Sequence, residues 1–530
     1  MHPTSTCCAL RTTRPAPCTA PPLHSHRADA LFVRIRPAPV PLPYVPCLPQ
    51  LRPAPLAVAR PSQAHEPHLR RIPLRKKLLA ALAITIATTL SAAGCGGSGT
   101  AGGGNTIKVV YWQHLDQNDK KQQKFLGSMK QSFEKAHPGK KVEIVPVTAS
   151  ENDYYTKIQL MMRSPSTAPD LVYEDTALIN SDITSGYLKP IDEYVAKWSE
   201  WGKFAKAAKA AVSSPTDGKT YAVPDDTDTR GIWYNQELLK KAGIKTPWQP
   251  KTWQDILDVA RTVKKKLPGV TPMNLYTGQA GGEQSTMQGF EMLLYGTDAA
   301  GDSLYDAESK KWITGSQGFK DALKFVHTVY GEDLGLSRST ALGANAGTEV
   351  GTKLLPENKL AINIDGSWMA NNWLKTGPRP WPEWTKTMAS AAMPTQHGQA
   401  PGKVSMSGGW AWSIPSKAKN PDLAWKFMKS IKNKAHSTQW NIIESTTAVR
   451  TDVAVDPKYL NATPTNKFFT GLVKYTHFRP ALPKYPQVSN AITKAMESVT
   501  TGQSSVDEAA KTYDQELATA VGSDSTAKGN

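Results

Sequence analysis

The sequence predicts an α/β fold, and two observations carry that prediction. Short runs rich in β-branched and aromatic residues alternate with stretches of helical apolar spacing over residues 106–173, and the pattern resumes after residue 220. Such alternation is typical of a parallel sheet with helices on its faces. With 530 residues, the chain is long enough to build two ordinary domains around substantial cores.

The first expected elements follow a β-α-β-α-β order. The first helix carries Phe125, Met129 and Phe133 at helical spacing and ends at Pro138-Gly139. In chain order we expect a strand at 106–112, a helix at 120–137, a strand at 141–147, a helix at 154–162 and a strand at 169–173.

The later elements are expected on either side of a polar stretch, residues 225–230. Thr252 is the expected N-cap of one helix, and Asn420 and Pro421 fill the N-cap and first positions of another. We expect strands at 220–224, 231–234, 360–364 and 410–414, and helices at 252–266, 317–330, 421–432 and 507–521.

An export signal is expected over residues 70–94. Arginines and lysines at 70–77 precede a 13-residue apolar run, 78–90, and small residues lead to Cys95. The run is too short for a membrane span, which needs roughly 20 apolar residues. The stretch 91–95 resembles the lipobox of bacterial lipoproteins, with Ala92 where leucine is usual. That resemblance implies acylation of Cys95, with 95–104 as a glycine-rich tether.

Simple secretion and an uncleaved anchor are the alternatives to lipidation, and the general secretory and twin-arginine routes both stay open.

Residues 1–69 differ in composition from the rest of the chain. The first 70 residues hold 15 of the 40 prolines, four of the five cysteines and no lysine. We expect an over-extended or disordered leader there, with the true translation start near Arg70.

Charge and motif content narrow the function classes. Residues 95–530 carry 51 basic and 43 acidic side chains, a net charge of +8, and no basic run interleaved with aromatics marks a nucleic-acid surface. No metal-ligand spacing, Gly-x-Ser-x-Gly elbow or His-Glu-x-x-His pair is present. We therefore expect no cofactor, no metal and no enzymatic activity. An enzyme using the acidic cluster at 225–228 stays an alternative.

Several ordered segments resemble the extracellular solute-binding proteins of ABC importers, in the sugar-serving, maltose-binding-protein-like branch. Each segment alone is weak, but their order is specific and covers nearly all of residues 105–525. The segments are PDLV (169–172), GYLKPID (186–192), GKTYAVP (218–224), WYNQELL (233–239), TWQD (252–255), NKLAI (358–362), GSW (366–368), GGW (408–410), AWKF (424–427) and SVDEA (505–509).

The resemblance implies two α/β lobes, three hinge crossings and a ligand cleft between the lobes. One lobe is expected to take residues 105–226 and 410–449, and the other 230–403 and 451–530. The crossings are expected near 224–229, 404–409 and 448–451. Closure of the lobes over a ligand would then be a hinge motion at element ends.

Two tryptophans are the expected stacking residues for a sugar. The resemblance places a stacking tryptophan at Trp368, with a core tryptophan as the alternative. Trp410 directly follows two glycines, where a close backbone approach is expected, and is a second stacking or lid candidate. Trp112 and Trp233 lie inside apolar strand runs and are expected in the core.

Polar candidates lie in the expected strand ends, crossings and loops. The resemblance implies rim carboxylates at Asp116 and Asp228. Glu174 and Asp175 directly follow an expected parallel strand, at its carboxyl end, where ligands gather. Further candidates are Arg450, at the third crossing, and Tyr276, Gln279 and Glu283, in a glycine-rich loop.

The function implied is a lipid-anchored, extracytoplasmic bacterial receptor that binds a sugar or oligosaccharide and delivers it to the permease subunits of an ABC importer, acting as a monomer. A receptor for another small solute is the alternative. The spacing Asp226-x-Asp228-x-Arg230-Gly231 imitates a calcium loop, but Arg230 stands where a ligand oxygen is required.

Overall fold

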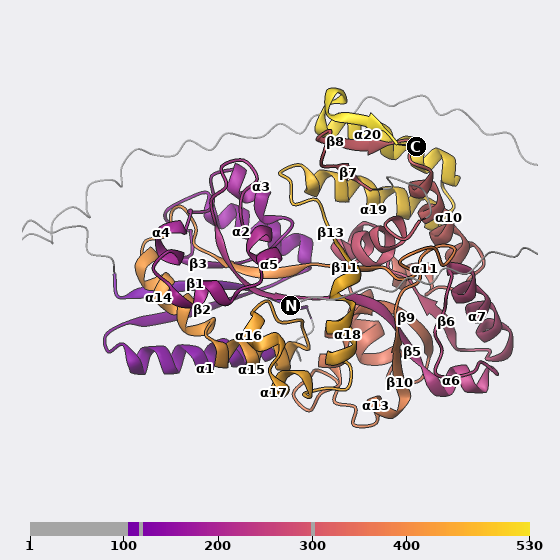
Figure 1. The fold of residues 1–530 in the computed structure, drawn as a ribbon, viewed down its shortest axis with the longest axis horizontal. Helices are drawn as coiled ribbons and strands as arrows, with labels where there is room; N and C mark the ends of the chain where they lie inside the picture. Colours follow the sequence, from indigo (N-terminus) through magenta and orange to yellow (C-terminus); the bar gives the residue numbers. More distant parts are fainter. Residues whose placement is uncertain (1–103, 116–119, 298–302, 530) are drawn as a thin grey trace, which may run out of the picture. The chain divides into compact units, whose positions relative to one another are not determined.

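The computed structural model describes residues 104–115, 120–297 and 303–529. It contains two main sheets flanked by helices, which confirms the α/β prediction (Figure 1). The leader, the export signal and Cys95 lie outside the described residues. No described helix has both the length and the apolar character needed to cross a lipid bilayer.

The first sheet has five strands and is mixed. The pairs β1–β2 and β1–β3 are parallel as expected, whereas β12, which comes from a distant part of the chain, runs antiparallel to both β3 and β4. In spatial order the strands are β2 (Lys141–Thr148), β1 (Thr106–Gln113), β3 (Leu171–Asp175), β12 (Gly409–Ser413) and β4 (Ala222–Thr227).

Both faces of this sheet are covered, as β1 illustrates. Val109 and Tyr111 pack into one apolar cluster, and Val110 packs into another, because successive strand side chains point to opposite faces. Around the sheet lie α1 (Lys121–Ala136), α2 (Glu151–Met162), α14 (Pro421–Ile431) and α15 (Lys434–Glu444). Helix α2 begins earlier than expected because the Ser150 side chain accepts from the Asp153 N–H.

The second sheet has the order β10 (Met388–Ala391), β5 (Arg230–Asn235), β9 (Leu360–Gly366) and β6 (Thr271–Asn274). Its core cluster joins α7 (Trp253–Lys266), α10 (Gln317–Gly331), α19 (Tyr485–Thr501) and α20 (Val506–Val521). Helix α19 was absent from the sequence prediction. It buries Ser489, Thr493 and Thr500 among its apolar residues, and these polar positions obscure the helical pattern.

The expected caps are found with one difference. Thr252 forms a capping box with Asp255 at the start of α7. Pro421 stands in the first turn of α14, but the Asn420 side chain donates to the Thr106 carbonyl oxygen at 2.8 Å instead of capping the helix.

Three segments that are far apart in the sequence meet at Thr227. Its backbone exchanges hydrogen bonds with Thr447, at 3.0 and 2.7 Å, and its hydroxyl donates to the Gly408 carbonyl at 2.6 Å. Gly409 has φ +143°, and a Cβ there would lie 2.3 Å from the Asp226 carbonyl oxygen, which confirms the expected close backbone approach.

The described chain contains further α-helices and strands. They are α3 (Ile179–Thr184), α4 (Asp192–Val195), α5 (Lys206–Ala211), α6 (Gln236–Lys241), α8 (Glu283–Thr286), α9 (Met292–Leu294), α11 (Arg338–Ala341), α12 (Ala346–Glu349), α13 (Trp384–Thr387), α16 (Thr451–Ala454), α17 (Pro457–Leu460), α18 (Asn466–Leu472), the paired strands β11 (Ser405–Ser407) and β13 (Thr476–Phe478), and the small sheet β14 (Thr526–Lys528), β8 (Lys311–Thr314) and β7 (Tyr305–Asp306).

Candidate functional site

A cavity of about 210 Å³ lies where the two sheets face each other through their strand ends. The first half of the chain means the part built around the first sheet, and the second half means the part built around the second sheet. Aromatic, carboxylate and guanidinium groups from both halves share the cavity wall. The wall includes Trp112, Tyr173, Asp175, Asp226 and Trp410 from the first sheet, Trp440 from α15, and Arg230, Tyr276, Glu283, Asp365, Trp368 and Arg479 from the other half.

An aromatic cluster forms the first-sheet side of the cavity. The Trp410 ring stacks on Tyr173 at 4.8 Å, on Trp112 at 5.3 Å and on Tyr155 at 6.1 Å between centroids. Trp112 packs against an apolar cluster of the first sheet as expected, but it is only half-buried and also lines the cavity. Trp233, in contrast, is fully buried as expected.

Trp368 lines the second-sheet side. It follows β9 in the 3₁₀ turn η5 (Ser367–Asn372), and its ring folds back over Gly366. A Cβ at position 366 would lie 1.9 Å from that ring, so glycine is required for this placement. The Arg230 guanidinium carbon lies 4.8 Å from the ring centroid, within cation–π range.

Arg230 is a fixed cation beside Trp368. Its Nη1 forms a short ion pair with Asp228, and its Nε donates to Gln288 Oε1 at 2.8 Å. The Gly408 N–H also donates to Asp228 Oδ1, at 3.0 Å. Asp228 is therefore on the cavity wall but is already held by a cation and a backbone donor.

The other two carboxylates of the acidic stretch have separate partners. Asp225 pairs with buried Lys432 and accepts from the Tyr173 hydroxyl at 2.8 Å. Asp226 accepts from Trp440 Nε1 at 3.0 Å, and burial followed by the charge of Asp225 raises its pKa well above the ordinary value. Because Asp226 lies in β4 and Arg230 in β5, the calcium-loop alternative does not match the structure.

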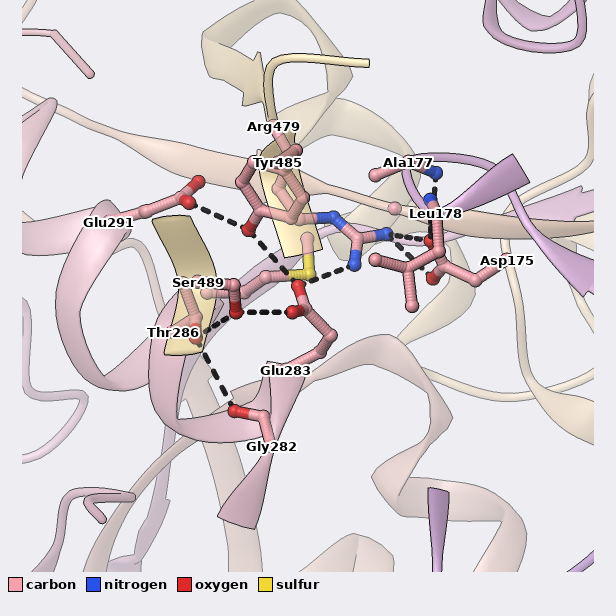
Figure 2. A network of polar contacts seen from close by, with 12 residues as sticks. Asp175, Ala177, Leu178, Gly282, Glu283, Thr286, Glu291, Arg479, Tyr485 and Ser489 are labelled. Carbon is pink, nitrogen blue, oxygen red and sulfur yellow. Dashed lines mark hydrogen bonds and ion pairs between the residues drawn. The ribbon is translucent and has the colours of Figure 1, made fainter. Parts of the chain in front are cut away.

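A buried polar network reaches the cavity through Asp175 and Glu283 (Figure 2). Arg479 joins them: its Nη2 donates to both Asp175 oxygens at 2.7 and 2.9 Å, and its Nη1 donates to Glu283 Oε2 at 2.7 Å. Tyr485 and Ser489, both in α19, also donate to Glu283. Arg479 was missed by the sequence analysis because no strand-end or helix pattern points to it.

Tyr276 and Asp365 form a further pair on the wall. The Tyr276 hydroxyl donates to Asp365 Oδ2 at 2.7 Å, and the Gly366 N–H donates to Oδ1 at 2.8 Å. Burial raises the pKa of Asp365 to about 6, although each of these hydrogen bonds lowers it. Asp365 was not among the candidates from the sequence.

The structure separates Glu174 from its neighbour Asp175. The two residues end β3, where side chains alternate, so Asp175 reaches the cavity and Glu174 is fully buried on the other side. Burial, followed by the nearby Asp182 carboxylate, raises the pKa of Glu174 well above its ordinary value.

Two other candidates, Arg450 and Gln279, lie away from this wall. Arg450 is buried and holds Asp452 and Glu200 in ion pairs. Gln279 borders a neighbouring cavity and binds Glu497 through its backbone N–H at 2.9 Å. Asp116 lies outside the described residues, so its expected role has no structural description.

Comparison with known proteins identifies the family of this chain. The family model for "Bacterial extracellular solute-binding protein" matches residues 116–436. The lactose-binding protein of Rhizobium radiobacter is 24% identical over 358 residues, which cover 67% of this chain and 78% of that protein.

Solved structures share the fold. A solute-binding protein of an ABC transporter from Thermotoga lettingae, bound with α-D-tagatose, is similar with a TM-score of 0.66 and 22% identity, covering 78% of this chain and 99% of that one. The GacH receptor of Streptomyces glaucescens, solved unliganded and with acarbose, has a TM-score of 0.65 and 23% identity, covering 78% and 98%. The fold is the two-lobed fold of these binding proteins, and the chain belongs to the bacterial extracellular solute-binding protein family.

Proposed function

We propose that this protein is a receptor that binds a sugar or oligosaccharide in the cavity between its sheets and delivers it to an ABC importer. A sugar presents hydroxyl groups around its edge and a weakly apolar C–H face, so its site needs aromatic rings together with a few fixed polar groups. The cavity wall offers both kinds of group. The sugar-binding relatives named above agree with this ligand class.

The observation that carries the proposal is the arrangement of Trp368 beside Arg230 and Asp228. The indole ring is held by Gly366 on one side and faces a guanidinium 4.8 Å from its centroid. A pyranose packed against the exposed part of the ring would bring its hydroxyls toward this ion pair, which offers both donors and an acceptor. We expect Trp410 and Trp112 to bind a further part of the ligand from the opposite side.

In this proposal, the lobes comprise residues 105–226 with 410–449 and residues 230–403 with 451–530. The strand order supports the division, since β4 belongs to the first sheet and β5, three residues later, belongs to the second. The hydrogen bonds of Thr227 to Thr447 and Gly408 bring the three crossings together at one place. A hinge there would let the lobes open and close as units.

The protein is proposed to release its ligand unchanged, acting as a monomer. Each buried carboxylate described on the wall already accepts from a cation, an indole N–H, a hydroxyl or a backbone N–H. This arrangement favours recognition of hydroxyl groups by fixed partners. Incubation with each bound saccharide, followed by chromatography of the recovered sugar, tests this point; recovery of a cleaved product would contradict it.

A lipid on Cys95 is proposed to hold the receptor at the outer face of the membrane. Incorporation of a labelled fatty acid into the full chain expressed in a bacterium tests this, with Cys95→Ser as the control. Label in the wild type that is lost in Cys95→Ser is the expected result. Label in neither would contradict lipidation and leave simple secretion or an uncleaved anchor.

The ligand class is tested by a thermal-shift screen of the protein against monosaccharides, oligosaccharides, amino acids and small anions. A ligand that binds only the folded state raises the unfolding midpoint, because it stabilises by RT ln(1 + [L]/Kd). We expect a saccharide to give the largest shift. A shift with an amino acid or an anion and none with any saccharide would contradict the proposal.

A further inference from the structure

An ion pair joins the two halves of the chain directly beside the cavity. Asp175 is the last residue of β3 in the first sheet, and Arg479 follows β13. The Asp175 and Arg479 side chains are only 6% and 2% exposed, and both Asp175 oxygens lie within 2.9 Å of Arg479 Nη2 (Figure 2). A charge-assisted contact this short and dry is among the stronger polar interactions in proteins.

The remaining contacts of Arg479 belong to the second half of the chain. Its Nη1 donates to Glu283, which begins α8, and its guanidinium carbon lies 6.0 Å from the ring of Tyr485, in α19. Tyr485 and Ser489 donate hydrogen bonds to Glu283, so the partner of Arg479 in the second half is itself fixed. The other side of the Arg479 guanidinium contacts Asp175, in the first half.

Asp175 also shapes the turn that follows β3. Its Oδ1 accepts from the backbone N–H of Ala177 at 2.7 Å and of Leu178 at 3.1 Å. Ala177 is buried within the core cluster of the second sheet, and Leu178 packs against the same cluster. One carboxylate therefore holds both the ion pair and the apolar turn that docks on the opposite half.

Each charged partner keeps a local partner if the two halves move apart. Asp175 would keep the two backbone donors, and Arg479 would keep Glu283. A buried charge left without any partner is strongly destabilising, but neither group would be left so here. The contact is therefore built to break and re-form without unfolding either half.

We propose that Asp175 and Arg479 form a latch that holds the two lobes closed over the cavity and thereby sets the affinity for the ligand. Both are positioning residues, acting through closure. A ligand that binds the closed form has an apparent affinity reduced by the fraction of molecules that are closed. Weakening the latch lowers that fraction, so the affinity falls even where the ligand's own contacts are intact. The affinity part of this proposal rests on the proposed binding function, whereas the closure part does not.

The test compares Asp175→Asn, Arg479→Gln and the double variant in the full chain. Closure is followed by amide hydrogen exchange around Asn371 and Glu444, whose side chains form another contact between the halves at 2.7 Å without touching Arg479. We expect faster exchange there in all three variants without ligand, and a Kd at least ten-fold higher for the saccharide found by the screen. The Kd of the double variant should not exceed that of the single variant with the higher Kd, because both substitutions break the same contact.

Glu332→Gln is the matched control, since it breaks the two-bond ion pair of Glu332 with Arg261, at 2.7 and 2.8 Å, within the second half of the chain. It should leave both readouts unchanged. Asp175→Asn is the variant expected to stay folded, because Arg479 remains paired with Glu283. Unchanged exchange around Asn371 in Asp175→Asn and Arg479→Gln would overturn the latch while leaving saccharide binding intact. If no saccharide binds the wild type, the proposed function and the affinity role of the latch both fail, and the exchange experiment alone decides closure.

Discussion

The indole of Trp368 lies directly over Gly366, so close that a Cβ at position 366 would come within 1.9 Å of the ring. Two residues apart in sequence, they form one unit: the glycine leaves room, and the tryptophan folds back to face Arg230. The backbone at Gly366 has φ −93°, which any residue can adopt. The glycine is therefore required for space alone.

Gly366→Ala is expected to weaken ligand binding about as much as Trp368→Ala. The added methyl group displaces the half-buried ring from the cavity wall, because the ring is free to swing where the backbone is not. We expect a Kd at least ten-fold higher by calorimetric titration, with the protein still folded by circular dichroism. An unchanged Kd in Gly366→Ala would show that the ring position does not matter for binding.

Gly409→Ala is expected to destabilise the crossing between the lobes. The position combines φ +143° with a Cβ site 2.3 Å from the Asp226 carbonyl oxygen, so both strain and a backbone clash oppose a side chain. We expect a loss of about 2 kcal/mol or more in the free energy of unfolding, measured with urea. Gly127→Ala is the control: it lies in α1, where a Cβ meets no described atom within 4 Å, and it should stabilise by about 0.5–1 kcal/mol.

Glu291 is expected to make stability depend on pH. Burial, followed by the charge of Glu283, raises its pKa from 4.5 to about 8. The folded state therefore holds a proton that the unfolded state releases, and the stability linked to that proton is complete below pH 4.5 and is lost as the pH rises through 8. Glu291→Gln should make the decline of the unfolding midpoint between pH 5 and 8 shallower. Exposed Glu143→Gln should leave the slope as it is, and an equal slope in both variants would contradict the assignment.

Arg450→Gln is expected to change stability without changing binding. Its guanidinium is 2% exposed and holds Glu200 and Asp452, outside the cavity wall. Losing hydrogen bonds to charged groups costs about 1.5–3 kcal/mol each at most, and these partners are partly solvated, so we expect a loss of about 1–3 kcal/mol in unfolding free energy. A Kd that rises several-fold while stability stays constant would restore the sequence-based expectation that Arg450 binds ligand.

The sequence predicted much of the fold because its signals are local. Helical spacing, a capping box at Thr252 and runs of β-branched residues each act over a few neighbours, and the corresponding elements are found. The direction of β12 and the helix α19 were missed. The first depends on a strand pairing between distant segments, and the second buries several hydroxyl groups that a pattern of apolar residues does not include.

The candidate site was harder to predict from the sequence, because its contacts also join distant segments. Strand ends correctly drew attention to Asp175, but alternation turns Glu174 away from the cavity. Arg479 reaches Asp175 from a segment about 300 residues later in the chain, a contact that no short motif records. Trp112 was assigned to the core because its strand is apolar, whereas the end of that strand borders the cavity.

The most direct test of the proposed receptor is a calorimetric titration of the wild type and Trp368→Ala with the saccharide that gives the largest thermal shift. Trp198→Ala serves as the control, because Trp198 is also half-buried but packs against Trp425 and Phe204, away from the cavity. We predict that the Kd rises at least ten-fold in Trp368→Ala, about 1.4 kcal/mol of binding free energy, and is unchanged in Trp198→Ala. Equal Kd values for the wild type and Trp368→Ala would contradict the central claim that this cavity holds the sugar.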